Sequence, residues 1–359
     1  MRAAVCYEFG QPLVIEEIEI DPPQQGEVRV RVTACGICHS DLHRLRGERG
    51  GSLPIVAGHE VAGIVEELGP GVSGIAPGDR VIVSLLRSCG RCFFCQTGAP
   101  HHCEENFALQ HETRLHTRDG VPIVQGVNVG GFAEQVVVDQ SQLVTVPDDV
   151  PLESVALLAC GVITGFGAVV NTANVPAGSS VVVIGTGGVG MNAIQGARLS
   201  GANPIIAVDV LDGKLEDARG FGATHGVNAT RSDAAEAVRA ISGARGADYV
   251  FVTVGSAQAA ELGLRLVRDA GTLVLVGMPP TGVDLPLPVF ETVYRSVRIL
   301  GSKMGGTRLS VDVPRLLDLY QAGRLQLDEL ITERYPLERI NEAVASVERG
   351  EALRHVIVM

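Results

Sequence analysis

The sequence contains no run of lysine or arginine residues, no internal repeat and no low-complexity segment. Its formal net charge is −12, whereas a surface that binds nucleic acid or anionic lipid needs a basic footprint. The first residues, 1–5, lead directly into strand-like sequence without an apolar signal segment, so we expect neither secretion nor a membrane-spanning helix. These absences favour a cytosolic protein that acts on a small molecule, with no nucleic acid and no membrane as partner.

Eight cysteines are present, and in a reducing compartment cysteines serve more often as ligands, nucleophiles or core residues than as disulfides. Four of them form the pattern C-x2-C-x2-C-x7-C. Two disulfides within so short a segment would close very small, strained loops, so the spacing favours a closed tetrahedral metal site of four thiolates. Such a site holds a loop together and does no chemistry, and the function must lie elsewhere. The four residues are Cys89, Cys92, Cys95 and Cys103.

The chain reads as two differently organised parts, as expected for 359 residues. Up to about residue 150, short alternating or β-branched segments such as 28–32, 61–68 and 79–83 predict the strands of a barrel. From residue 179 onward, apolar runs alternate with glycine turns and helical segments, which predicts a parallel sheet covered on both faces. Helical patterns return at 313–321 and 340–348.

A glycine-rich turn joins the apolar run 181–184 to a helical segment at 189–199. In this strand-turn-helix context G-x-G-x-x-G predicts a dinucleotide site, because the turn lets backbone N–H groups approach a pyrophosphate at the positive end of a helix. The next run ends at Asp209, whose carboxylate can bind the adenosine ribose hydroxyls and repel a 2′-phosphate, which favours NAD over NADP. Lys214 is a weaker candidate for the same ribose, since such a lysine is usually a solvated side chain. The turn comprises Gly185, Thr186, Gly187, Gly188, Val189 and Gly190.

Two further segments carry residues that can bind a metal: 35–43, with the letters C-G-I-C-H-S-D-L-H, and 58–60, with G-H-E. Taken singly, each has an ordinary explanation as a turn histidine or a small buried thiol. Together with the four-cysteine loop, 159–165 and the glycine-rich turn, they make the chain resemble the zinc-dependent medium-chain alcohol dehydrogenases over essentially its whole length. The segment 330–332, Pro336 and the segment 340–342 are also similar to that family.

The resemblance implies a GroES-like β-barrel catalytic domain, residues 1–160 and 303–359, and a Rossmann domain with a doubly wound parallel sheet, residues 161–302. It implies two Zn²⁺ ions per subunit, one of them catalytic and held by Cys38, His59 and Cys160 with one position left open. Spacing alone would not have found Cys160. In related polyol dehydrogenases a glutamate is expected there, so the cysteine favours the alcohol branch.

The resemblance also implies roles around the catalytic metal. Ser40 and His43 would carry the alcohol's proton to solvent, although His43 could instead be an exposed turn histidine. Asp41 would orient His59, and Glu60 would lie behind the metal and modulate its coordination. The remaining predicted cofactor contacts are His39 and Arg354 at the pyrophosphate, with Thr164, Val189, Val276 and Met278 against the rest of NAD.

The implied activity is reversible, NAD-linked hydride transfer between a primary or secondary alcohol and its aldehyde or ketone. Leu85, Thr164 and Phe132 are candidates for the substrate pocket, and Arg49 counts against the formaldehyde adduct of glutathione, whose dehydrogenases carry an acid there. An NADH-dependent reductase, a dehydrogenase of another thiol adduct, an enzyme with permanently bound NAD, and a non-catalytic NAD- and zinc-binding sensor stay open. A homodimer is favoured over a tetramer.

Overall fold

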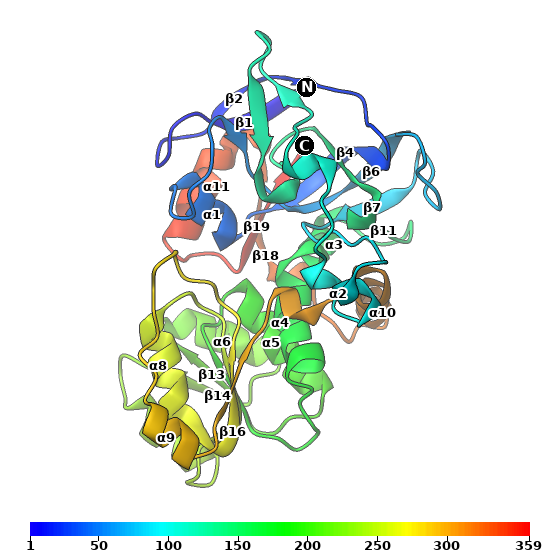
Figure 1. Ribbon diagram of the computed structural model, residues 1–359. Helices are drawn as coiled ribbons and strands as arrows, with labels where there is room; N and C mark the ends of the chain where they lie inside the picture. Colours follow the sequence, from blue (N-terminus) through cyan, green and yellow to red (C-terminus); the bar gives the residue numbers. More distant parts are fainter. The chain divides into compact units, whose positions relative to one another are not determined.

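The computed structural model describes residues 1–359, which form two compact units. The first unit consists of Met1–Cys160 together with Arg308–Met359, and the second of Gly161–Thr307 (Figure 1). The chain thus leaves the first unit once and returns to it for its last segment. No single helix reaches the length and hydropathy of a membrane span; only the broken pair Leu152–Ala159 and Gly161–Thr172 does so if its two parts are joined.

The first unit contains two sheets. The larger follows the order β11-β7-β6-β4-β19-β18, with β10 also paired to β4, and the smaller follows β2-β1-β5-β9-β8-β3. The ten-residue β4 pairs with three other strands and alternates buried with less buried positions over much of its length, as expected for a strand with one face in the core. The strands are β1 Arg2–Cys6, β2 Val14–Glu17, β3 Glu19–Ile20, β4 Glu27–Gly36, β5 Ile55–Val56, β6 Glu60–Leu68, β7 Arg80–Val83, β8 Leu115–His116, β9 Pro122–Gln125, β10 Gln135–Asp139, β11 Leu143–Thr145, β18 Ile331–Pro336 and β19 Arg354–Val358.

Helices of the first unit are short except for the two that follow the return of the chain. They are α1 His39–Leu45, α2 Phe93–Gln96, α3 Leu152–Val155, α10 Leu309–Gln321 and α11 Ile340–Glu348. A single apolar cluster, which includes Val28, Val30, Phe132, Ile340 and Ile357, joins the sheets to α1 and α11. The C-terminal segment is therefore part of the first unit's core rather than an appendage.

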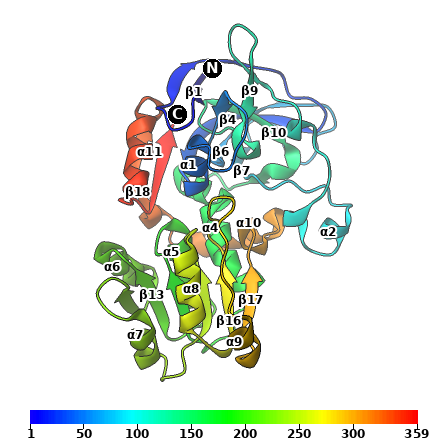
Figure 2. The same ribbon diagram turned by 60° about the vertical axis from the view of Figure 1, so that its left-hand side comes forward.

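The second unit is built on one sheet of six strands, all parallel, in the order β14-β13-β12-β15-β16-β17. Counted from its first strand this is the order 3-2-1-4-5-6 of a Rossmann fold, and it reverses between β12 and β15, where the carboxyl ends of the strands form a crevice that binds ligands. Every residue of β12 is buried, and α5 and α8 pack along the strands (Figure 2). The elements are α4 Gly161–Gly167, β12 Val181–Ile184, α5 Gly188–Leu199, β13 Ile205–Asp209, α6 Asp212–Phe221, β14 His225–Asn228, α7 Ala234–Ile241, β15 Ala247–Val252, α8 Ala257–Leu266, β16 Val267–Leu275, α9 Val289–Tyr294 and β17 Arg298–Gly301.

The predicted fold class, a β-rich domain combined with a doubly wound parallel sheet, is confirmed. Element ends differ from the sequence pattern by a few residues: the apolar run at 249–254 belongs to β15, which ends at Val252. The segment 121–129 contains the strand β9 followed by a 3₁₀ turn at Gly126–Asn128, with Val127 and Asn128 at positive φ. Such a backbone cannot continue a ladder, which explains the early end of the strand.

Candidate functional site

Asp41, in the first turn of α1, ties together the segments that carry two of the predicted metal ligands. Its Oδ2 accepts a hydrogen bond from the backbone N–H of Cys38 at 3.1 Å. Its Oδ1 accepts from the N–H of Gly58 at 3.0 Å and lies 2.9 Å from His59 Nδ1. The carboxylate is fully buried, and because it can only accept, it holds a proton of His59 on Nδ1 and leaves Nε2 as the nitrogen that can bind a metal.

Four donors meet in the buried interior of the first unit, with their ligand atoms all within 4.8 Å of one another: Cys38, His59, Glu60 and Cys160. Cys160 comes from the far end of this part of the chain, just after the 3₁₀ turn Ala156–Ala159. Two thiols and an imidazole in one pocket are the donor types that zinc prefers, at a separation that one ion can bridge. The donor set therefore fits the catalytic zinc that the resemblance implies.

The pKa values of the two thiols in this cluster are shifted in opposite directions. A hydrogen bond with Cys160 is the main cause that holds the pKa of Cys38 well below its usual range, and the same bond and burial raise the pKa of Cys160 well above its own. Burial alone would lower the pKa of His59, but Asp41 and Cys38 outweigh it and raise the pKa overall. The hydrogen bond thus favours the thiolate form of Cys38 over that of Cys160, and a bound dication would favour the thiolate of both.

Glu60 is the fourth donor, and it has a partner of its own. Arg354, at the start of β19 and 5% exposed, places Nη2 3.3 Å from Glu60 Oε1. Burial raises the pKa of Glu60 to about 7, although Arg354 works in the opposite direction. The carboxyl is therefore close enough to the metal ligands to join them and is also held by a cation on its other side.

Ser40 and His43 lie on α1, three residues apart and so on neighbouring positions of one helix face. The Ser40 hydroxyl donates to Cys38 Sγ at 3.2 Å and lies 3.2 Å from His59 Nε2, which places it at the metal cluster. His43 is half-buried, and its Nδ1 contacts Glu48 Oε2. Glu48 was not singled out from the sequence; the only signal was an acid placed directly after the glycine that follows α1.

The four cysteines of the C-x2-C-x2-C-x7-C segment also come together, again with all Sγ atoms within 4.8 Å. The Sγ atoms of Cys92 and Cys103 lie 3.9 Å apart, far beyond the ~2.05 Å of a disulfide, and all eight cysteines of the chain are free, which excludes the disulfide alternative. Backbone N–H groups, first that of Glu104, lower the pKa of Cys92 to about 6. Four half-buried thiols with backbone donors around them fit a structural zinc ion.

In the second unit, the glycine-rich turn occupies the crevice at the carboxyl end of β12. Gly190 has no room for a side chain, since a Cβ would lie 1.9 Å from the carbonyl oxygen of Gly185, and this close approach packs α5 onto the strand. A Cβ on Gly187, in contrast, would meet nothing within 4 Å. The N-terminus of the twelve-residue α5 therefore has an open side where a phosphate could approach its N–H groups.

Asp209 ends β13 beside this turn. Its Oδ2 accepts from Thr186 N at 2.7 Å and from the Thr186 hydroxyl at 2.9 Å, while Oδ1 accepts from Val210 N at 2.7 Å. The carboxylate is thus fixed at the edge of the glycine-rich turn, where a dinucleotide would present its adenosine ribose.

The other predicted cofactor residues lie in varied surroundings. Val276 is buried and Met278 is 61% exposed, both after β16. Thr164, on α4, donates to Met304 Sδ at 3.6 Å, and Lys214 is half-buried on α6. His39 is exposed at the start of α1.

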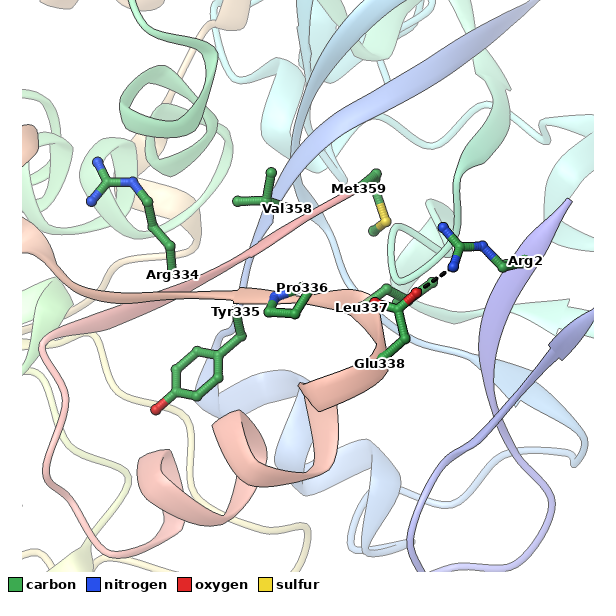
Figure 3. Close-up of a pocket in the computed structure, with 8 residues that line it drawn as sticks. All are labelled: Arg2, Arg334, Tyr335, Pro336, Leu337, Glu338, Val358 and Met359. Carbon is green, nitrogen blue, oxygen red and sulfur yellow. Dashed lines mark hydrogen bonds and ion pairs between the residues drawn. The ribbon is translucent and has the colours of Figure 1, made fainter.

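A hollow of about 390 Å³ lies in the first unit, beside β18 and β19 (Figure 3). Arg2 and Glu338 form an ion pair across one side of it. None of its lining residues is a predicted site residue, and its walls are mainly apolar. They are Arg2, Arg334, Tyr335, Pro336, Leu337, Glu338, Val358 and Met359.

Comparison with known proteins gives the same assignment for both units. Residues 24–148 match the alcohol dehydrogenase GroES-like domain, and residues 188–322 match the zinc-binding dehydrogenase family. The chain is 37% identical to an NDMA-dependent alcohol dehydrogenase of Amycolatopsis methanolica, over 99% of this chain and 98% of that one.

Solved structures agree over the full length. An alcohol dehydrogenase zinc-binding domain protein from Burkholderia ambifaria is 35% identical with a TM-score of 0.95, over 100% of this chain and 98% of that one. A benzyl alcohol dehydrogenase from Acinetobacter calcoaceticus is 32% identical with a TM-score of 0.92, over 100% and 99%. The chain belongs to the zinc-containing medium-chain alcohol dehydrogenase family.

Proposed function

We propose that this alcohol dehydrogenase transfers hydride reversibly between an alcohol and NAD, with Cys38, His59 and Cys160 as ligands of its catalytic zinc. The observation that carries the proposal is the buried cluster in which these three donors and Glu60 lie within 4.8 Å of one another. A site with three protein ligands keeps a position for substrate, which distinguishes it from the four-cysteine site.

When bound, the zinc ion supplies a Lewis acid that polarises the alcohol hydroxyl, and the nicotinamide supplies the hydride acceptor. The chain supplies positioning and a proton acceptor. Ser40 Oγ lies 3.2 Å from both Cys38 Sγ and His59 Nε2, and it can accept a substrate proton while passing on its own. His43, one helical turn further on, is the imidazole that receives it.

Glu60 has two roles in the proposal. Its position among the donors lets it act as the fourth metal ligand when no substrate is bound. Its contact with Arg354 stabilises the carboxylate when substrate takes that coordination position instead. Asp41 fixes the orientation of His59 throughout, since its oxygens hold the imidazole and the backbone on both sides.

The choice of NAD rather than NADP rests on Asp209. Its carboxylate is anchored by Thr186 and by the backbone that follows it, so it cannot easily turn away from a ribose at the glycine-rich turn. A 2′-phosphate there would meet a fixed negative charge.

For the substrate we propose a primary or secondary alcohol with an apolar side group. Leu85 follows β7 and is half-buried, so that it can line a pocket, whereas Phe132 is fully buried in the core of the first unit. The similar benzyl alcohol dehydrogenase agrees with an aromatic or other apolar alcohol.

We further propose that the enzyme is a homodimer joined through the second unit. The edge strand β17 has one unpaired side, and its residues are exposed or half-buried. The preceding helix α9 exposes four large apolar side chains, a pattern typical of an interface. They are Val289 at 66%, Phe290 at 80%, Val293 at 72% and Tyr294 at 79% exposed.

The deciding experiment is a panel of primary, secondary and aromatic alcohols assayed with NAD and with NADP, together with the zinc content per chain. We expect about two zinc ions per chain and NAD reduction that stops when a chelator removes the ion bound by Cys38, His59 and Cys160. A chain with a single zinc and no alcohol-dependent reduction of either cofactor would instead be the non-catalytic sensor. Light scattering gives the mass in solution and tests the dimer.

A further inference from the structure

We propose that Glu48 is a positioning residue for proton release: its carboxylate holds His43 with the proton on Nδ1, so that Nε2 is free to accept the proton that leaves the alcohol. The inference rests on the proposed function, because it assigns the partner of the imidazole in that reaction. It starts from the contact between His43 Nδ1 and Glu48 Oε2.

The backbone after α1 brings Glu48 back to the helix. Gly47 has φ +73°, and a Cβ there would lie 2.9 Å from the ring of Phe9, so the position accepts only glycine without strain. The N–H of Glu48 then donates to the carbonyl of His43 at 3.0 Å. This turn places the Glu48 carboxylate over the last turn of α1, where it contacts the imidazole of His43.

The charges around Glu48 keep it ionised. Its hydrogen bond with His43 is the main cause that lowers the pKa of the Glu48 carboxyl, and Arg46 acts in the same direction. Arg46 Nη1 lies 3.7 Å from Glu48 Oε1, while its Nε and Nη2 donate to Glu348 Oε1 on α11 at 3.0 and 2.7 Å. Glu48 is therefore a carboxylate held between an imidazole and a guanidinium that α11 anchors.

An ionised carboxylate only accepts hydrogen bonds, so the nitrogen that faces it must carry the proton. A neutral imidazole has one N–H, and with Nδ1 occupied in this way Nε2 has a lone pair. A carboxylate in this position also stabilises the imidazolium that forms when Nε2 gains a proton, as the aspartate does in serine protease triads.

The proton balance is simple. Nε2 of His43 gains one proton, originating from the alcohol hydroxyl, and the ring becomes an imidazolium whose charge is matched by Glu48. The imidazolium then gives one proton to water, which can reach the pair because the side chains of His43 and Glu48 are 21% and 29% exposed. No proton stays on Glu48, and the ring returns to its neutral form.

The simpler alternative is that the Glu48 contact only holds the loop after α1. The chain offers a matched control, because Glu348 is the other carboxylate bound to Arg46 and has no contact with His43 among its described interactions. Glu48→Gln and Glu348→Gln each remove one negative charge beside Arg46, but only Glu48→Gln changes the partner of the His43 imidazole.

The first measurement needs no activity. Enzyme labelled with ¹⁵N-histidine, without substrate, is studied at about pH 9, where ordinary imidazoles are neutral, and the His43 signals are identified by their loss in His43→Gln. We expect Nδ1–H in the parent and in Glu348→Gln, and a shift towards Nε2–H in Glu48→Gln, because a glutamine amide can donate as well as accept. The same tautomer in all three proteins overturns the proposal.

The second measurement is alcohol oxidation at steady state. We expect Glu48→Gln to lower kcat by roughly tenfold with little change in the alcohol KM, and added imidazole buffer to restore much of the loss because it accepts the proton from outside. Glu348→Gln should show neither effect. A loss that is equal in both variants, or that buffer does not restore, overturns the proposal in favour of a loop contact. If the parent itself oxidises no alcohol, the proposed function fails, while the ¹⁵N spectra still decide whether Glu48 sets the His43 tautomer.

Discussion

Replacing Asp41 with asparagine should loosen the catalytic zinc while leaving the structural one in place. The two Asp41 oxygens accept three hydrogen bonds: Oδ2 from Cys38 N, and Oδ1 from Gly58 N and His59 Nδ1. Asparagine keeps an acceptor at only one of these places. If its carbonyl takes the place of Oδ1, its NH₂ group faces the N–H of Cys38; in the other orientation, two donors lose their acceptor.

At least one buried N–H is therefore left unpaired, at a cost of about 1–3 kcal/mol, and the charge that strengthens the bond to His59 is lost as well. Because the site is fully buried, water cannot replace the missing acceptor. The partners that orient metal ligands in this way typically contribute 10- to 100-fold in affinity, which corresponds to about 1.4–2.7 kcal/mol. We expect a loss of that size for the zinc at Cys38, His59 and Cys160.

The assay is a titration of the holoenzyme with a chromogenic chelator, with total zinc measured by mass spectrometry. Two steps are expected, and in Asp41→Asn the step assigned to the catalytic zinc should move to a 10- to 100-fold lower chelator concentration. The four-cysteine site serves as the internal reference. Asp233→Asn is the control, since Asp233 also accepts backbone N–H groups at the start of a helix, α7, and belongs to neither metal cluster. If both zinc steps of Asp41→Asn coincide with those of the parent and of the control, the assigned role of Asp41 is refuted.

Four further changes test other parts of the structure. Gly187→Ala should leave Tm within a few degrees of the parent, because its Cβ would meet no protein atom, but should weaken NAD binding at least tenfold, because the Cβ would enter the space of the cofactor. The control Gly213→Ala, at an equally open position on α6, should change neither Tm nor NAD binding. Asp209→Ser should lower the ratio of kcat/KM for NAD to that for NADP by about 10- to 100-fold, and an unchanged ratio would remove Asp209 from the specificity argument. Cys103→Ser should reduce zinc from about two ions per chain to about one and lower Tm, as measured by metal analysis and calorimetry; retention of both ions would contradict the four-thiolate site. His39→Arg should tighten NAD binding and slow turnover where cofactor release is limiting, and unchanged values of both would count against a pyrophosphate contact.

A separate measurement addresses how the cofactor is held. Denaturing the purified enzyme and analysing the released small molecules distinguishes an exchangeable NAD from one that stays bound through turnover. Stoichiometric NAD in the released fraction, with no stimulation by added NAD, would identify the permanently bound form.

Local sequence was sufficient wherever the chemistry lies within a short segment. The four cysteines at 89–103 are so close along the chain that a short loop can bring their thiols together around one metal ion. In the structure their Sγ atoms do lie together. The glycine-rich turn depends only on the strand before it and the helix after it, and the structure has both, as β12 and α5. The apolar runs of the second unit likewise identified buried parallel strands, because a strand covered on both faces must be apolar throughout.

Tertiary structure decided the contacts between distant segments. Cys160 joins Cys38 and His59 from another part of the chain, and Arg354 reaches Glu60 from the last strand, so that no periodicity or spacing could reveal either. Resemblance to the family supplied Cys160 as a ligand, but not the cation beside Glu60. Glu48 was missed for a related reason: its contact with His43 requires a turn at positive φ on Gly47, which sequence alone does not specify. Short-range sequence patterns therefore determined which metal-binding and cofactor-binding groups this chain carries. The tertiary structure determined which of these groups meet, because the free energy that brings remote residues together comes from the packed core rather than from the residues themselves.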